Sequence, residues 1–444
     1  MKIVQICGLI EGAGITRFMI ELNYAFKAAG HDVEIYYCQH EDEVKNAKPK
    51  WQDVSGVIKY DYSPEMLAHI NEADVVCINQ LMPAKADAKY KEPFMRLITE
   101  QINKPKKIFF INGHNTVGYK FYGVELLHDK EFLNSFDRIA TFNPNTALYG
   151  IIKETLGEEE AMKKYIYMHL PYHFDTVYTE NWVPATEKAK RVTYIGRWAG
   201  FKNPKQVQEF HKLARNDFEF EMRGIVPMIG TAAVPDLFYE IQIDKRPLKE
   251  RIIGPSKFTE IINGKWLKEH GLPADDLCLD YPHGDKMYIF GAYIREDGLK
   301  AMAKASFGAE FHILKDGRFY GDNTEYAQIE IIEQGTLPLY DYFTGENIHM
   351  YENGISTGKS MVDLEMGVYL KKDRSNAAEV IEKMNWLYAN PDKYDEMRHN
   401  CLDIMRKHTD PVATADRLLD DLFNPKPIKI SYKPKEKFSA DSLF

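Results

Sequence analysis

Cysteine is scarce in this sequence, and the few cysteines form no recognisable pattern. Only five occur among 444 residues, and they are odd in number and scattered. The spacings CxxC and HExxH are missing, so the common structural zinc sites and the zinc-protease motif have no support. Isolated thiols in apolar strand-like runs behave as small hydrophobic residues. We therefore expect a protein of the reducing cytoplasm without a metal site.

Long apolar runs are missing as well. No stretch approaches the roughly 20 uninterrupted apolar residues that a membrane-spanning helix requires. The amino terminus has one positive charge and then a short strand-like run, without the long apolar core and the small-residue cleavage site of a signal peptide. These absences predict a soluble chain that has no membrane partner.

The chain also lacks a surplus of positive charge. Its formal net charge at pH 7 is −9, which argues against a surface that binds nucleic acid everywhere but allows a local basic cleft. What is present is ordinary folding material, with 44% hydrophobic and 13% aromatic residues. A length of 444 residues exceeds the size at which one core usually stops growing, so we expect two domains and a large cleft between them.

Strand-like and helix-like runs alternate through the first part of the chain. Residues 2–8 are typical of an apolar strand and residues 15–29 of an amphipathic helix, and Gly30 ends this helix before a second strand at 32–38. Further strands, with room for crossover helices between them, are expected at 73–79, 106–112, 137–142 and 165–170. This alternation predicts a parallel, doubly wound α/β sheet.

The same pattern starts again after a polar interval at about 181–190 that contains Pro184. We therefore predict two Rossmann-like domains that face each other across a cleft, at 1–180 and 181–424. Strands of the second domain are expected at 191–196, 218–222, 287–290, 308–314, 336–340 and 367–370, and helices at 325–334, 376–389 and 392–422. The proline- and lysine-containing interval 226–285 is predicted to be an insertion, and 425–444 a polar tail.

Gly12 and Gly14 lie in the turn between the first strand and the first helix. Backbone amides and the positive end of the helix can receive an anion there, although a tight turn would use the same residues. A dinucleotide site would need a third glycine where Arg17 stands and an acid at the end of the second strand. Asp32 and Glu34 fall at the start of that strand, and no GxxxxGKS/T loop occurs. A nucleotide-sugar site is therefore favoured over a nicotinamide site.

Two cations meet where the first strand of the second domain ends. Arg197 closes the strand, and Lys202 follows five residues later. Beside a leaving diphosphate they would stabilise the charge that develops as the glycosidic bond breaks, and a solvated Arg and Lys on a surface loop are the alternative. No DxD motif occurs, so we expect cations and helix ends to hold the diphosphate, with no metal ion and no cofactor required.

Glu325 and Glu330 belong to a helical run that ends at Gly335 and leads into a strand. A carboxylate there can accept hydrogen bonds from both ribose hydroxyls, whereas a helix-dipole contact would explain Glu325 better than Glu330. His114 follows the strand at 106–112, at a carboxyl strand end where α/β enzymes place ligands. It is a candidate for contact with the transferred sugar or for proton transfer from the acceptor, and a capping or packing histidine is the alternative.

At these residues the sequence resembles the DNA α-glucosyltransferases of T-even bacteriophages, a family of retaining GT-B enzymes that glucosylate hydroxymethylcytosine in DNA. The resemblance runs in order and register through most of the chain, and its strongest blocks are 8–18, 30–33, 195–202, 210–211, 325–330, 335–338 and 344–347. It implies a UDP-sugar as donor and double-stranded DNA that contains hydroxymethylcytosine as acceptor.

The resemblance also implies roles for five residues: Gly14, Arg197 and Lys202 at the diphosphate, Glu330 at the ribose, and His114 at the sugar or the acceptor. Two features depart from the family. Asn115 stands where the family has an aspartate next to the histidine, so that no carboxylate base is available there. The interval 226–285 is longer than its counterpart in the family.

The predicted function is transfer of a sugar, glucose by the resemblance, from a UDP-sugar to the hydroxymethyl group of 5-hydroxymethylcytosine, which would protect phage DNA from nucleases in the host cytoplasm. The modified base would be turned out of the stack, and the leaving phosphate itself would accept the proton of the acceptor. Three alternatives stay open: a pentose donor such as UDP-arabinose, a bacterial enzyme that acts on glycan or lipid, and a non-catalytic module that binds a nucleotide-sugar.

Overall fold

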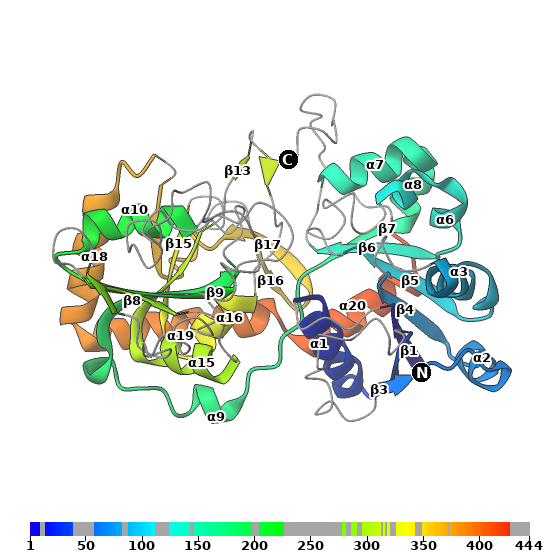
Figure 1. The fold of residues 1–444 in the computed structure, drawn as a ribbon, viewed down its shortest axis with the longest axis horizontal. Helices are drawn as coiled ribbons and strands as arrows, with labels where there is room; N and C mark the ends of the chain where they lie inside the picture. Colours follow the sequence, from blue (N-terminus) through cyan, green and yellow to red (C-terminus); the bar gives the residue numbers. More distant parts are fainter. Residues whose placement is uncertain are drawn as a thin grey trace, which may run out of the picture.

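The chain folds around two separate seven-stranded sheets, which form the two lobes seen side by side in Figure 1. The computed structural model describes residues 1–8, 14–38, 57–81, 88–111, 124–142, 146–197, 204–225, 278–280, 286–290, 295–311, 314–315, 318–319, 326–341, 349–371 and 373–426. Among them, no helix is both long enough and apolar enough to cross a bilayer. The four cysteines whose side chains are described are free and buried: Cys7, Cys38, Cys77 and Cys401.

The first sheet is parallel throughout. Its central strand β1 (Lys2–Cys7) pairs with β2 (Asp32–Tyr37) on one side and with β4 (Val75–Gln80) on the other. The full order is β3-β2-β1-β4-β5-β6-β7, and the remaining strands are β3 (Val57–Lys59), β5 (Lys106–Ile111), β6 (Arg138–Phe142) and β7 (Tyr165–Met168). Because the order reverses between β1 and β4, a ligand crevice is expected at the carboxyl ends of these two strands.

The helices of this lobe begin and pack as their sequences dictate. In α1 (Gly14–Ala28), Phe18, Leu22 and Phe26 recur every four residues and are at most 1% exposed, which confirms the apolar face predicted for this helix. At α2 (Pro64–Asn71), the Ser63 hydroxyl accepts from the Met66 amide at 3.2 Å. The other helices are α3 (Ala88–Arg96, continued by the π-turn Leu97–Gln101), η4 (Val124–His128), α6 (Lys130–Asn134), α7 (Thr146–Leu156) and α8 (Glu158–Lys164).

The second sheet repeats this arrangement, with one change at its edge. Its order is β10-β11-β9-β8-β12-β15-β18, with strands β8 (Ala189–Arg197), β9 (Glu219–Ile225), β10 (Cys278–Asp280), β11 (Lys286–Phe290), β12 (Ala305–Glu310), β15 (Leu337–Asp341) and β18 (Val368–Leu370). All pairs are parallel except β10 with β11. The interval between β9 and β10 corresponds to most of the predicted insertion, which therefore leaves and rejoins the sheet near one edge.

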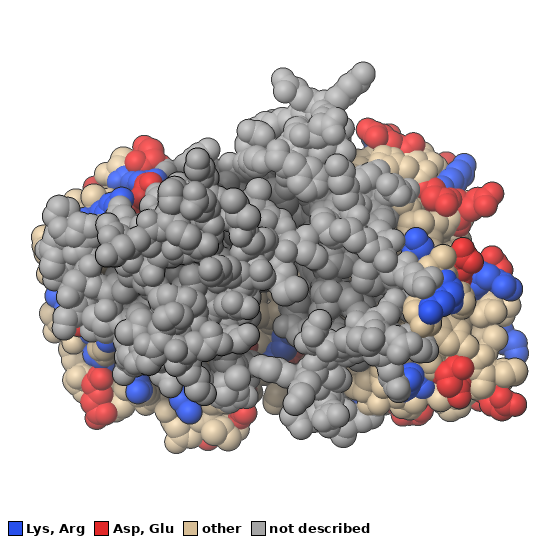
Figure 2. Space-filling model, in the orientation of Figure 1, with Lys and Arg blue, Asp and Glu red and all other residues tan. Residues whose placement is uncertain are grey.

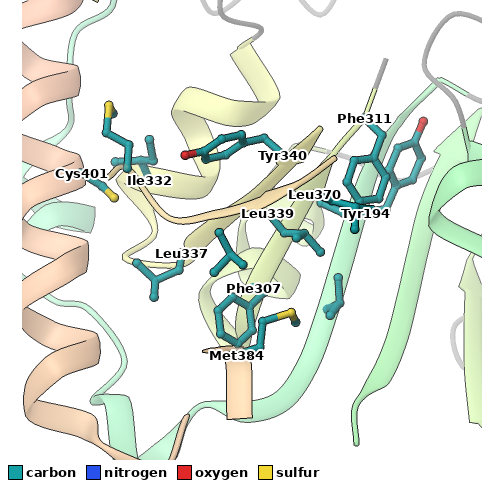
Figure 3. Packing of buried hydrophobic residues seen from close by; sticks show 14 of the residues in the cluster. Tyr194, Phe307, Phe311, Ile332, Leu337, Leu339, Tyr340, Leu370, Met384 and Cys401 are labelled. Carbon is teal, nitrogen blue, oxygen red and sulfur yellow. The ribbon is translucent and has the colours of Figure 1, made fainter. Parts of the chain in front are cut away.

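The described helices that accompany this sheet are α10 (Pro204–Ala214), α15 (Arg295–Lys304), α16 (Tyr326–Glu333), α18 (Ala377–Ala389) and α19 (Pro391–His408). The core between sheet and helices is seen in Figure 3, where Phe307, Leu337 and Leu339 from the strands lie near Met384 of α18 and Cys401 of α19. All five side chains are at most 1% exposed. This dense packing fixes the position of the strand ends that form the candidate site.

Within the described residues, the chain crosses twice between the lobes. The first crossing follows β7 and contains α9 (Thr176–Thr179) and the turn η5 (Ala185–Glu187), and the second leads from α19 into α20 (Pro411–Phe423). The Tyr172 amide donates to the Thr409 carbonyl at 3.0 Å, so the two crossings lie side by side. Helix α20 then packs on α1, as seen at the centre of Figure 1, and Leu418 and Leu422 share a core with Phe18. The second half of the chain thus supplies one helix to the first lobe.

Most predicted strands are confirmed within one or two residues, and the differences have local causes. Strand β12 begins at Ala305, three residues before the predicted start, because α15 runs directly into it without a turn. The short edge strands β3 and β10 have too few residues to show alternation. Analysis of the sequence also missed the hairpin of β16 (His349–Glu352) and β17 (Ile355–Ser360) and the two-residue strands β13 (Leu314–Lys315) and β14 (Arg318–Phe319).

Candidate active site

The strands β1 and β8 occupy equivalent places in the two sheets. Each of these strands lies where the strand order reverses, and the next described element in each case is a helix, which begins at Gly14 for α1 and at Pro204 for α10. The structure therefore places Gly14 and the backbone of Arg197 at the two reversal points, where doubly wound folds bind ligands. The side chain of Arg197, together with Gly12 and Lys202, lies outside the described residues.

Glu330 is the predicted site residue whose side chain the structure describes. It lies in α16 between apolar neighbours, since Ile329, Ile331 and Ile332 are at most 1% exposed, while Glu330 itself is partly exposed. The helix is thus anchored by its apolar side, and Glu330 lies outside this buried side. Glu325 precedes the first residue of α16 and lies outside the described residues.

A glycine in the sheet brings α16 close to the strand ends. Gly308 lies in β12, and a Cβ atom built on it would stand only 2.6 Å from the side chain of Ile331. The helix can therefore lie against the strand only because position 308 has no side chain. Strand β12 ends two residues later at Glu310, so that Gly308 sets the height of α16 above the edge at which a donor would bind.

The carboxyl end of α16 is closed by a Schellman motif. The Thr336 amide donates to the Ile331 carbonyl at 3.1 Å and the Gly335 amide donates to the Ile332 carbonyl at 2.9 Å. Gly335 adopts a φ of +64°, and the ring of Trp182 lies 2.5 Å from the place of its absent Cβ. A side chain there would be strained and would collide with the ring. The predicted stop of this helix at Gly335 is confirmed.

Three carboxyl strand ends of the second sheet meet at one edge, because β8, β12 and β15 are parallel neighbours. They end at Arg197, Glu310 and Asp341, and the last two are 3% and 1% exposed. Sequence reasoning did not single out these two acids. The available signal was an acidic residue that closes an otherwise apolar run, which resembles the position of Arg197 at the end of β8.

His114 and Asn115 lie outside the described residues, three and four positions beyond the end of β5 at Ile111. Strand β5 is separated from β1 by β4 alone, so the segment after β5 leaves the edge about 10 Å, or two strand spacings, from the turn after β1. The block at 210–211, which carried part of the resemblance, is core. Phe210 and His211 are fully buried, and the His211 ring packs edge-on against Phe220 with centroids 4.9 Å apart.

The two lobes are joined next to these elements by a network of charged and aromatic side chains. From the first lobe, Glu21 of α1 binds Arg17 at 2.6 Å and accepts from the His173 amide at 2.8 Å. From the second lobe, Glu333 of α16 accepts from the Tyr172 hydroxyl at 2.8 Å. The segment that follows β7 is therefore held by the first helix of one lobe and by the helix that carries Glu330 in the other.

Acidic and basic side chains alternate on the visible outer surface. Figure 2 shows lysine or arginine and aspartate or glutamate interspersed over the described part of the lobe that contains the first sheet. The described part of this face presents no field of one sign. Among the described residues, no group of three histidine, cysteine or acidic side chains is arranged to hold a metal ion.

No protein-family model matches the chain. It is similar to the DNA α-glucosyltransferase of Enterobacteria phage T4, with 20% identity over 425 residues, which cover 90% of this chain and 94% of that protein. This full-length similarity confirms the predicted resemblance.

Solved structures show the same fold. An α-glucosyltransferase in complex with UDP-glucose and DNA containing an abasic site superimposes with a TM-score of 0.69 at 19% identity, over 95% of this chain and 99% of that one. An α-glucosyltransferase in complex with UDP and a 13-mer DNA containing an HMU base gives a TM-score of 0.68 at 18% identity, over 96% of this chain and 100% of that one. HepE of Anabaena in complex with UDP and glucose gives 0.54 at 11% identity, over 96% and 100%. The predicted GT-B fold of two Rossmann-like units is confirmed.

Proposed function

We propose that this protein is a UDP-sugar-dependent glycosyltransferase that transfers glucose to the hydroxymethyl group of 5-hydroxymethylcytosine in double-stranded DNA. The observation that carries this proposal is the similarity to phage T4 DNA α-glucosyltransferase along 90% of the chain. A full-length match constrains both lobes at once, whereas a match to the nucleotide-sugar lobe alone would leave the acceptor open. The modification would protect phage DNA from nucleases in the cytoplasm of the host.

The donor would bind at the carboxyl edge of the second sheet. Glu330 is partly exposed on a helix whose apolar side is buried, and its carboxylate would accept hydrogen bonds from the ribose hydroxyls. Arg197 and Lys202 follow β8 and would stabilise the diphosphate as it leaves. The amides before and within the first turn of α1, around Gly12 and Gly14, would meet the same phosphates from the opposite lobe.

The transfer would retain the configuration of the sugar and need no metal ion. The sequence has no DxD motif, and the paired cations supply the charge that a metal would otherwise provide. The leaving phosphate would take the proton of the acceptor hydroxyl. His114 would orient the sugar or the acceptor. Asn115 beside it offers no carboxylate that could act as a base.

The acceptor base would leave the DNA stack to reach the donor. A hydroxymethyl group inside a duplex lies too deep for a buried sugar to reach, so enzymes that modify bases turn the nucleotide out into a pocket. Lys245, Lys249, Lys257 and Lys265 of the insertion and the lysines of the tail would contribute to a basic rim for the backbone.

The decisive experiment is mass spectrometry of nucleosides after hydroxymethylcytosine DNA has been incubated with the protein and a panel of UDP-sugars. We expect a gain of one hexose with UDP-glucose, unchanged when EDTA is present. A gain of one pentose with UDP-arabinose would change the sugar and keep the acceptor. No gain with any sugar would reject the proposal, and unmodified cytosine DNA is the matched control.

A further inference from the structure

A buried carboxylate of the second lobe holds the segment that crosses between the lobes. Glu333 is 1% exposed, and its two oxygens accept from the Tyr172 hydroxyl at 2.8 Å and from the Asp175 amide at 2.9 Å. Its own carbonyl accepts from the Trp182 indole at 2.7 Å. One residue at the end of α16 thus fixes three points of the crossing.

A second buried carboxylate does the same from the first lobe. Glu21 of α1 is 3% exposed, and it accepts from the His173 amide at 2.8 Å while Arg17 binds its other oxygen at 2.6 Å. The His173 ring stacks on Tyr24 with centroids 3.9 Å apart. Two neighbouring residues of the crossing, Tyr172 and His173, are therefore bound to opposite lobes.

These contacts form a continuous path between the two ends of the expected donor site. Arg17 lies in the first turn of α1, three residues after Gly14, and its guanidinium stands 5.3 Å from the centre of the Tyr172 ring. Tyr172 then donates to Glu333, which follows Glu330 by three residues and so shares a face of α16 with it. Each end of the path is within one helical turn of a residue assigned to the donor.

Buried carboxylates are a costly way to anchor a segment that only connects two lobes. Removing a carboxylate from water costs several kcal/mol, which directional hydrogen bonds must offset, whereas apolar side chains would anchor a linker at lower cost. Hydrogen bonds, however, are directional and fix the distance between the bonded groups within tenths of an ångström. Both buried carboxylates use their oxygens to fix the backbone of the same short segment, from opposite lobes.

We propose that Glu21 and Glu333 are positioning residues that set the spacing between the glycine turn of the first lobe and the ribose carboxylate of the second, by fixing the crossing segment to both. The inference rests on the proposed function, since it assigns the donor to both lobes. A ligand with contacts in both lobes would sense this spacing. A ligand with contacts in the second lobe alone would not.

The test compares UDP, which would meet both lobes, with uridine, which would meet the second lobe alone. Tyr172→Phe deletes the hydroxyl that Glu333 binds and keeps the ring under Arg17. We expect UDP affinity in isothermal titration to fall about 10-fold, the equivalent of about 1.4 kcal/mol, with uridine affinity within about 2-fold of the unsubstituted protein. Tyr340→Phe is the matched control, because Tyr340 is equally buried and donates to the Met361 carbonyl inside the second lobe.

Glu333→Ala should weaken UDP binding further, and Glu333→Gln should restore most of it. The glutamine can turn its oxygen to the Asp175 amide and its nitrogen to the Tyr172 hydroxyl, and so keep both contacts without the charge. Circular dichroism and thermal unfolding of each variant establish that it is folded. Rescue by glutamine supports a role of geometry rather than of charge.

Three results would overturn the inference. UDP affinity that is unchanged while the thermal midpoint falls would make the contacts purely structural. A parallel loss of UDP and uridine affinity would place the effect inside the second lobe. Unsubstituted protein that binds neither ligand would remove the proposed function itself, and the inference with it.

Discussion

The two sheets share one plan and differ at their edges and turns. When β7 is left out of the first sheet and β10 out of the second, six parallel strands remain in each. Numbered by their order along the chain, these strands lie in the order third, second, first, fourth, fifth, sixth, which is β3-β2-β1-β4-β5-β6 in one sheet and β11-β9-β8-β12-β15-β18 in the other. The first sheet adds the parallel strand β7 next to β6, whereas the second adds the antiparallel strand β10 at the opposite edge. The shared plan sets where ligands can bind, and the turns decide which ligands they are.

Equivalent turns carry different chemistry. The segment after β1 contains Gly12 and Gly14, and the segment after β5 contains His114, whereas the counterparts of these strands, β8 and β15, end in the charged residues Arg197 and Asp341. Charge on the second sheet suits a diphosphate and a ribose, while the small and neutral groups on the first leave room both for the donor phosphates and for an approaching acceptor. This difference predicts that substitutions in the second lobe damage donor use, and the first two experiments below test this prediction.

The largest effect is expected for Arg197→Ala. Loss of a cation that stabilises the leaving diphosphate should lower kcat by about 100- to 1,000-fold, as measured by transfer of radiolabelled glucose to hydroxymethylcytosine DNA. Arg197→Lys should recover only part of this loss, because an ammonium cannot make the two-pronged contact of a guanidinium. Arg96→Ala, at an exposed position of α3 (67% exposed), is the control. Full activity of Arg197→Ala would remove the assigned mechanism.

Glu330→Gln should act on donor binding rather than on the chemical step. Hydrogen bonds to a charged acceptor contribute about 1.5 to 3 kcal/mol, so we expect KM for UDP-glucose to rise about 10- to 100-fold with kcat nearly unchanged. Initial rates at varied donor concentration measure both constants. Glu382→Gln, on the exposed side of α18, keeps the same change of charge away from the site. A large fall in kcat at constant KM would contradict the ribose role.

The fold could be predicted largely from the sequence because its strands are apolar and separated by helix-length intervals. Apolar runs ended by glycine or charge located β1, β5, β8 and β15 closely. Strand order could not be derived in this way, since it depends on contacts between distant segments. The packing of α20 on α1 could not be predicted either, because the apolar face of α20 would fit either lobe.

The candidate site could be predicted where a motif lies at a strand end and not where tertiary contacts create it. Glycine turns and Arg197 stand out by type and position. Glu21 and Glu333 do not, because an acid in an amphipathic helix is usually solvated, and only the fold shows that both are buried against the crossing segment. Predicted roles for His114, Lys202 and Glu325 stay predictions, since these residues lie outside the described part of the chain.

A smaller effect is expected for a substitution at Gly308, a position at which β12 differs from its counterpart β4. β4 has Val76, Cys77 and Ile78 in its interior, whereas β12 has Gly308 beneath Ile331. Gly308→Ala should reduce the free energy of unfolding by about 1 to 3 kcal/mol through overpacking, and it should raise KM for UDP-glucose because α16 is displaced. Urea unfolding followed by tryptophan fluorescence measures the stability change.

The double variant Gly308→Ala/Ile331→Ala isolates this contact. Removing the isoleucine branches gives the new methyl group room, so the double variant should lose less than the sum of the two single variants. Strict additivity would mean that the strand and the helix adjust without strain. In that case Gly308 would not set the position of Glu330.

The smallest effect on activity is expected for a buried lysine at the amino edge of each sheet, because the candidate site lies at the opposite edge. Lys188, just before β8, is 2% exposed, and its ammonium donates to the carbonyls of Ala303 and Ala305 and to the Thr336 hydroxyl at 2.8, 3.2 and 3.0 Å. Burial, assisted by nearby Arg398, lowers the pKa of Lys188 from 10.5 to about 7. Burial also lowers the pKa of Lys107 in β5, but Asp137 opposes this shift.

A lowered lysine pKa makes stability rise with pH. Between pH about 7 and 10.5 the unfolded chain holds the proton that folded Lys188 has released, so the free energy of unfolding should increase by up to about 1.4 kcal/mol per pH unit. Below pH 7 Lys188 is protonated in both states, so the full cost of burying its charge lowers the free energy of unfolding and no longer changes with pH. Lys188→Met should remove this slope between pH 7 and 9.5 in urea unfolding, and Lys107→Met should change it less. If the free energy of unfolding changed with pH equally in both variants, Asp137 would not counteract the lowering of the Lys107 pKa.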